Sequence, residues 1–139
     1  MSTTTTAMIT SIVTTLSVTG VKRKYTEPPA SLSTADLPAS YPFGFTREEG
    51  PMTFQTHGGW PTHTLDFNIA CEPVGQSTQP VNYALVQTMS DNLSSALAAS
   101  SPNAIGKAPL TWVIRSGNIQ LEVAGIAYWG VSATITARG

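Results

Sequence analysis

The segment of residues 62–72, THTLDFNIACE, constrains the fold of this chain more than any other stretch. Every second residue from Leu65 onward is apolar, in the set Leu65, Phe67, Ile69 and Cys71, and the alternate set is Thr64, Asp66, Asn68 and Ala70. Side chains of a β-strand point alternately to opposite faces, so this pattern predicts a strand with one dry face and one wet face. The rest of the chain must therefore supply a cover for the dry face.

Two segments have the periodicity of amphipathic helices and can provide this cover. Residues 7–18 are predicted to form the first helix, with Gly20 ending it. Residues 80–99 are predicted to form the second, with Thr78 as its cap and Pro80 in its first turn. The apolar stripes are Met8, Ile9, Ile12, Val13 and Leu16 in the first helix, and Val81, Ala84, Leu85, Met89, Leu93, Ala96 and Leu97 in the second.

The remaining segments predict further strands. Residues 21–25 look extended, and residues 41–47 and 52–57 flank a hairpin-like turn at residues 48–51. Residues 110–115, 118–123 and 126–137 follow the second helix, with a break at residues 124–125. In the last strand Ala127, Trp129, Val131, Ala133 and Ile135 form the dry face, and Tyr128, Gly130, Ser132, Thr134 and Thr136 form the wet face.

These elements predict one domain, residues 1–139, with an α+β fold. We expect a single antiparallel sheet, mixed at most, of about five strands with two helices packed on one face. The prolines of residues 27–42 exclude helix and central strand, so we expect a long connection there. Long connections in compact domains often make functional contacts.

The near balance of positive and negative charge limits the functions that this chain can have. Seven Lys and Arg against eight Asp and Glu leave a net charge of −1, which argues against a protein whose main task is to bind nucleic acid backbone. Charged residues make up only 11% of the chain, where soluble domains usually carry about 25%. So few charges protect a lone domain poorly against association. We therefore expect copies of the same chain, or partners, to cover much of its surface.

Cysteine content and hydropathy exclude other classes. The single cysteine, Cys71, excludes an internal disulfide and cysteine-rich zinc sites, and its place on the apolar face predicts a core residue. No apolar run approaches the ~20 residues of a bilayer span, and the N-terminal MSTTTT lacks the basic region of a secretory signal. We expect a protein made in a cytoplasm that does not associate with a membrane.

Residues with catalytic potential are sparse. His63 lies close to Asp66 and Glu72, which are predicted to share the polar face of residues 62–72, and His57 is six residues away. Such a group could be a weak metal site or an acid–base pair, although catalytic metal sites normally have three protein ligands. Solvated surface residues are the alternative reading, and the chain has no nucleotide-binding or hydrolase motif. We predict no enzyme, no catalytic, cofactor-binding or metal-binding residue and no cofactor; a small metal-dependent hydrolase remains a distant alternative.

Several exposed-looking residues are candidates for contacts between subunits. They are the basic cluster, the prolines of the long connection, the hairpin tip and one tryptophan: Lys22, Arg23, Lys24, Pro28, Pro29, Arg47, Glu48, Glu49 and Trp60. Three adjacent basic residues are also common in solvated turns, and a charged hairpin tip can be simply solvated. Trp60 and Trp112 suit either a core or an interface, whereas Trp129 shares the dry face of its strand and is predicted to be core.

The chain resembles the tail terminator, or tail completion, proteins of long-tailed bacteriophages. The resemblance begins with MITSIVTTLSVTGVKRKYTEPPASLSTADLPASYP: an amphipathic helix, a small-residue turn at Gly20, a strand, the Pro28-Pro29 loop and the Leu37-Pro38 step into the sheet. It continues with the tryptophan-led segment 60–69, the helix at 80–99 and a last strand that begins Tyr128-Trp129-Gly130. These features span nearly the whole chain, although the family's members often carry more acidic residues.

The resemblance implies a structural virion protein of the tail or neck region, assembled in the host cytoplasm. Such a protein forms a ring, six copies in that family, that caps the head-proximal end of the tail tube, stops tube polymerisation and provides the docking surface for the head. The implied partners are other copies of the chain, the tail tube protein and the head–tail connector or neck proteins, while genomic DNA passes through the ring without specific binding. Another head–tail joining protein, such as an adaptor or stopper, is the closest alternative.

Overall fold

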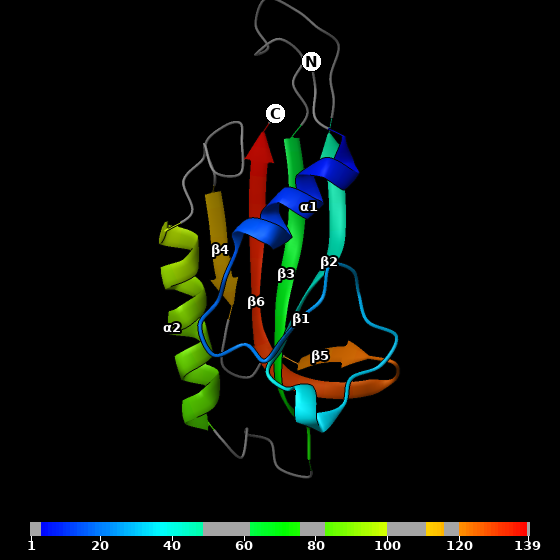
Figure 1. Ribbon diagram of the computed structural model, residues 1–139, viewed down its shortest axis with the longest axis vertical. Coiled ribbons are helices and arrows are strands. Elements are labelled where there is room, and N and C mark those ends of the chain that lie inside the picture. Colours follow the sequence, from blue (N-terminus) through cyan, green and yellow to red (C-terminus); the bar gives the residue numbers. More distant parts are fainter. Residues whose placement is uncertain (1–3, 49–61, 76–82, 100–110, 116–119, 139) are drawn as a thin grey trace, which may run out of the picture.

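The computed structural model describes residues 4–48, 62–75, 83–99, 111–115 and 120–138, apart from a few side chains within them (Figure 1). Its two helices and one short 3-10 helix are α1 (Thr5–Thr15), α2 (Tyr83–Ala99) and η1 (Thr34–Asp36). Its strands are β1 (Arg23–Lys24), β2 (Ala39–Glu48), β3 (Thr62–Pro73), β4 (Thr111–Arg115), β5 (Gln120–Val123) and β6 (Ile126–Arg138). The expected return strand at residues 52–57, together with Thr78 and Pro80, lies outside the described residues.

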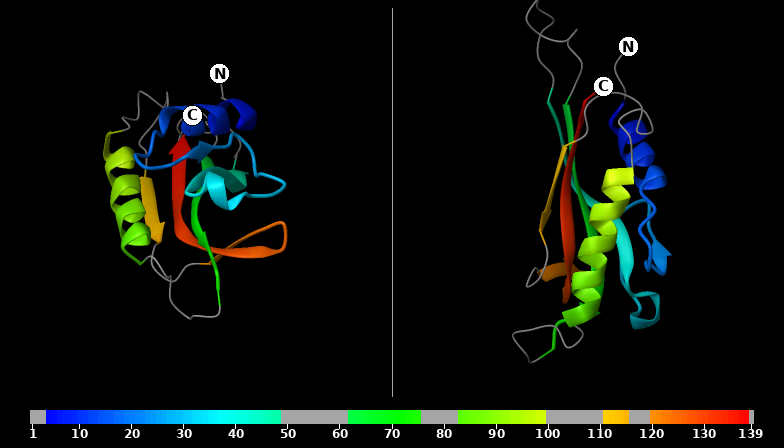
Figure 2. Two further views of the ribbon diagram at one scale, coloured as in Figure 1. Left: turned by 60° about the horizontal axis from the view of Figure 1, so that its bottom comes forward. Right: turned by 90° about the vertical axis from the view of Figure 1, so that its left-hand side faces the viewer.

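The strands form one mixed sheet in the order β1-β2-β3-β6-β4, and β5 pairs with β6 off this path. β1 runs parallel to β2, and all other neighbours are antiparallel. Figure 2 shows both helices on the same side of this sheet. The predicted α+β architecture is therefore confirmed. The short parallel pair makes the sheet mixed.

The main core lies between the two helices and one face of the sheet, which we call the helix face. The predicted dry sets of residues 62–72 and of the last strand all contribute, except Ala127, which is partly exposed. α2 differs slightly from the prediction, because Val86 is buried and Ala84 is exposed. The buried residues of this core are Met8, Ile12, Leu16, Leu65, Phe67, Ile69, Cys71, Val86, Met89, Leu93, Leu97, Trp129, Val131, Ala133, Ile135 and Ala137.

α1 begins with a side-chain cap and ends earlier than expected. Thr4 Oγ1 accepts a hydrogen bond of 3.1 Å from the Ala7 backbone N–H, which satisfies one free donor of the first turn. The helix ends at Thr15, and Leu16 is its C-cap, so the prediction that Gly20 ends the helix is wrong. Gly20 instead has φ +92°, and a β-carbon there would lie 2.6 Å from Met89 Cε. This glycine therefore allows the chain to cross closely over α2.

The opposite face of the sheet has a second, smaller core, which the sequence patterns did not predict. Residues from the connection before β2 and from the β5–β6 hairpin cover one end of this face, so Asn68, Ala70 and Tyr128 are buried although they belong to the predicted wet sets. The buried apolar residues of this second core are Leu37, Ala39, Tyr41, Ala70, Leu121, Val123 and Tyr128. Tyr25 and Leu32 pack against it.

The proline-rich connection is shorter than the predicted range of residues 27–42 because β2 begins at Ala39. Pro42 pairs with Phe67 of β3, whereas β1 reaches only Ala39 and Ser40 on the other side of β2. A proline in the part of a strand that has a single neighbour leaves the ladder intact, because no second strand needs its N–H. The register between β2 and β3 then shifts between Pro42 and Phe45.

Candidate functional site

The two central strands, β3 and β6, carry six short polar side chains on the sheet surface opposite the helices, and we call these six the polar face. Strand register places Thr64, Asp66 and Asn68 of β3 directly across from Thr136, Thr134 and Ser132 of β6. Five of the six are partly exposed, and Asn68 is buried at the end that the second core covers. Asp66 is the only member of the polar face that carries a charge.

Cross-strand hydrogen bonds hold this surface in place. Ser132 Oγ donates to Asn68 Oδ1 at 2.7 Å, and Thr134 Oγ1 donates to Asp66 Oδ1 at 3.1 Å. Opposed residues of an antiparallel pair lie close enough for such bonds to form without a change of backbone. The polar face is thus a surface of small side chains tied to each other across the two central strands.

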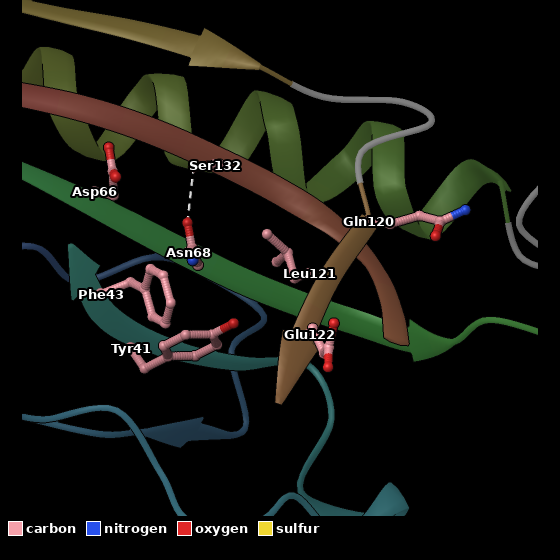
Figure 3. Close-up of a pocket in the computed structure, with 8 residues that line it drawn as sticks. All are labelled: Tyr41, Phe43, Asp66, Asn68, Gln120, Leu121, Glu122 and Ser132. Carbon is pink, nitrogen blue, oxygen red and sulfur yellow. Dashed lines mark hydrogen bonds between the residues drawn. The ribbon is translucent and has the colours of Figure 1, made fainter. Parts of the chain in front are cut away.

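The polar face ends in a hollow of about 380 Å³ beside the β5–β6 hairpin (Figure 3). Tyr41 and Phe43 of β2 form one wall, with ring centroids 6.4 Å apart and ring planes at 82°. Gln120, Leu121 and Glu122 of β5 form the opposite wall, and Asp66, Asn68 and Ser132 form the floor. Tyr41 is buried, whereas 54% of the Phe43 surface is exposed.

The titratable groups of the hollow are a tyrosine hydroxyl and two carboxylates. Burial raises the pKa of the Tyr41 hydroxyl, and a hydrogen bond with Asn68 offsets part of this rise, so the hydroxyl stays protonated at neutral pH. Asp66 and Glu122 are its two carboxylates. Among the described residues no three His, Cys, Asp or Glu side chains lie close enough to hold a metal ion.

The structure separates the residues of the predicted histidine group. His63 is opposite Ala137 and Arg47 on the helix face and is only 3% exposed, whereas Asp66 lies on the polar face. A register shift after Ala70 sets Glu72 opposite Trp129, so the prediction that Asp66 and Glu72 share a face is wrong. His57 lies outside the described part of the chain. His63 and Asp66 therefore cannot act on one substrate from the same side of the sheet.

The basic cluster lies at the β1 margin of the sheet. Lys22, Arg23 and Lys24 are all exposed. The Arg23 guanidinium carbon lies 5.3 Å from the centre of the Tyr25 ring, and Lys24 Nζ donates to the Thr14 backbone oxygen at 3.4 Å. Partial burial lowers the pKa of Lys24. The next candidates, Pro28 and Pro29, are exposed and partly exposed, respectively.

The other interface candidates lie along or beyond β2. Arg47 and Glu48 are the last two residues of this strand, so Arg47 lies in a strand as predicted, whereas the prediction that Glu48 begins the turn is wrong. Arg47 is partly buried, with Nη1 donating to Thr5 Oγ1 at 3.4 Å, and Glu48 is exposed. Glu49 and Trp60 lie outside the residues that the structure describes, and so does the Trp112 side chain.

An apolar groove runs along β2, and the sequence patterns did not predict it. It has a volume of about 340 Å³ and lies between the start of α1, the proline-bearing connection and β2. Phe43 and Phe45 are 54% and 58% exposed beside it. Its lining residues are Thr6, Ile9, Thr10, Thr26, Glu27, Pro28, Phe43 and Phe45. The available signal was the brevity of residues 21–25, which predicts that most of the next strand lacks a neighbour on that side.

Comparison of the chain with protein-family models and with curated protein sequences finds no match. In the described part of the chain, neither helix has the length and hydrophobicity to cross a membrane. The function is therefore inferred from the geometry of the protein's surfaces. Their main elements are a sheet covered by helices on one side, a polar face on the other, and exposed aromatic residues beside β2.

Proposed function

We propose that this protein is a structural component of a phage tail: a terminator that forms a ring on the head-proximal end of the tail tube. In this role the ring stops addition of tube protein and presents its opposite side to the head. The protein acts by occupying surfaces and carries out no reaction.

The observation that carries the proposal is the order of elements from α1 to β2. The amphipathic helix, the glycine crossing at Gly20, the short strand β1, the prolines and the Leu37-Pro38 step follow one another as the resemblance to tail terminators implies. Leu37 is buried in the second core, so this step anchors the connection to the sheet. The tail assignment itself rests on this resemblance.

The character of the surface supports an assembly role. Charged residues make up 11% of the chain, and several large apolar side chains remain exposed in the single copy: Phe43, Phe45, Tyr83, Val113 and Ile126. Exposed apolar groups on a sparsely charged surface are typical of a protein that is covered by other subunits. The small polar side chains of the polar face also suit a surface past which DNA moves without specific binding.

Electron microscopy of tube assembly tests the proposal. Purified protein is added to polymerising tube protein from the same phage, and tube length and tube ends are compared with a reaction without it. We expect shorter tubes with annular density at one end, and annular particles at high concentration of the protein alone. Tubes of unchanged length with bare ends would contradict the proposal, and exclusive binding to portal or adaptor protein would identify another head–tail joining protein.

A further inference from the structure

Two strands of the sheet have an open side in the described structure. β1 pairs only with Ala39 and Ser40 of β2, so β3 is the single described strand that pairs with residues 41–48 of β2. β4 is the last strand of the sheet at the opposite margin, with β6 as its single described neighbour (Figure 1). An open strand side exposes backbone N–H and C=O groups that another strand can bind.

The directions of these two strands allow them to pair between copies. β2, β3, β6 and β4 are antiparallel in succession, so β2 and β4 point in opposite directions. If β4 of one copy lies beside β2 of the next, the alternation continues and the helices of both copies stay on the same side of the joined sheet. The five residues of β4 also fit within the eight open residues of β2.

Apolar groups are exposed along both strands. Phe43 and Phe45 stand along β2, and Val113 is 62% exposed on β4. The groove beside β2 adds Ile9 and Pro28 to this apolar surface. Phe45 opposes Leu65 on the helix face, whereas Val113 opposes Thr134 on the polar face, so pairing of the two strands would cover apolar groups on both faces of the joined sheet. Removal of part of their surface from water favours association by about 25 cal/mol for each Å² of apolar surface buried.

Use of both open strands favours a head-to-tail contact over a symmetric one. The β1–β2 margin carries Lys22, Arg23 and Lys24, and the β4 margin carries both Asp91 of α2 and Arg115 of β4, so charge alone does not select a partner strand. A contact between β2 and β2 across a two-fold axis would leave β4 of both copies without a second strand. A contact between β2 and β4 gives each of these strands a second neighbour, and its repetition in one rotational sense closes a ring.

We propose that copies of this protein join by antiparallel pairing of β4 in one copy with residues 41–48 of β2 in the next. The proposal rests on the self-association in the proposed function and is independent of the identity of the phage partners. It makes the polar face continuous from one copy to the next.

Cysteine cross-linking tests this pairing. Thr46→Cys and Val113→Cys are combined in one chain, because both side chains are exposed on the two strands concerned, and a short bismaleimide linker tolerates small differences in register. We expect a ladder of covalent oligomers that ends in a closed species. The reaction is run with the protein alone and with tube protein, because a ring that forms only on the tube would cross-link only in the second reaction.

Three control chains separate this contact from others. Thr46→Cys alone and Val113→Cys alone should yield no covalent oligomers, which also shows that the buried Cys71 does not react. Thr46→Cys with Glu122→Cys has the same number of thiols, but Glu122 is exposed on β5, away from β4, so we expect little cross-linking. Covalent dimers of the Thr46→Cys single variant would overturn the proposal in favour of a two-fold contact.

The outcomes for pairing and for function are distinguishable. Annular particles without cross-links in the double variant would overturn the strand pairing and leave the terminator function standing. The ladder of cross-links together with uncapped tubes would support the pairing and overturn the terminator function. A protein that stays monomeric in native mass spectrometry, with and without tube protein, would overturn both.

Discussion

Ser132 Oγ donates a 2.7 Å hydrogen bond to Asn68 Oδ1, which joins the two central strands across the floor of the hollow. Ser132→Ala removes the donor and leaves Asn68, which is 5% exposed, without this bond. We expect the free energy of unfolding to fall by about 1–2 kcal/mol. Urea denaturation of Ser132→Ala, Asn68→Ala and the double variant measures the coupling energy between the two side chains. If the two losses of unfolding free energy simply add in the double variant, the hydrogen bond contributes nothing to stability.

Phe67 is fully buried in the main core, under the two helices. Phe67→Ala should lower the free energy of unfolding by about 3–5 kcal/mol, since a large aromatic site is emptied. Phe45→Ala is the matched control, because it makes the same chemical change at a side chain that is 58% exposed, and we expect a much smaller loss. Equal unfolding midpoints for the two variants would mean that the strand register is wrong.

Gly130 lies where β6 passes beneath the β5 hairpin. A β-carbon at this position would lie 2.2 Å from the Ile69 backbone oxygen and 2.8 Å from Leu121 Cδ1. Because a backbone oxygen cannot move aside as a flexible side chain can, Gly130→Ala should strongly destabilise the fold or prevent it. Gly75→Ala adds the same methyl group where no atom lies within 4 Å and should leave the melting temperature nearly unchanged.

Burial raises the pKa of the Cys71 thiol to about 12, with a smaller contribution from Glu72. Unfolded chains release this proton near pH 9, whereas the folded protein keeps it, so the unfolded state binds fewer protons between pH 9 and about 12. Stability should therefore fall with rising pH in this window. Denaturation at several alkaline pH values should show a shallower fall for Cys71→Ala than for the natural chain, whatever the cost of the substitution itself.

The helix face was predictable because its residues follow simple periods. Alternation in residues 62–72 and the helical stripe from Met8 to Leu16 identified its buried side chains, and Trp129 was correctly placed in the core. The second core was not predictable in this way. Tyr128 and Ala70 have the spacing of a wet face and become buried only because segments distant in sequence fold over them. Periodicity describes one element at a time and does not reveal which other segment covers it.

The candidate surfaces were only partly predictable. The exposure of the basic cluster follows from its composition and was expected. His63 and Asp66 do not form one site, because they are an odd number of residues apart in β3 and therefore point to opposite faces of the sheet. The exposure of Phe43 and Phe45 depends on where β1 ends, and the strand order that leaves β4 at the margin depends on pairings between distant segments. Neither of these is encoded in a local pattern.

β6 pairs with β3, β4 and β5, yet it comes after all three in the chain. During synthesis, those three strands leave the ribosome without the strand that joins them, and both helices are made before the surface they cover is complete. A polypeptide that stops before Ile126 cannot complete the sheet, and it leaves apolar surface of α1 and α2 uncovered. Incomplete products thus lack the β4 margin in its proper position and are excluded from any assembly that uses it.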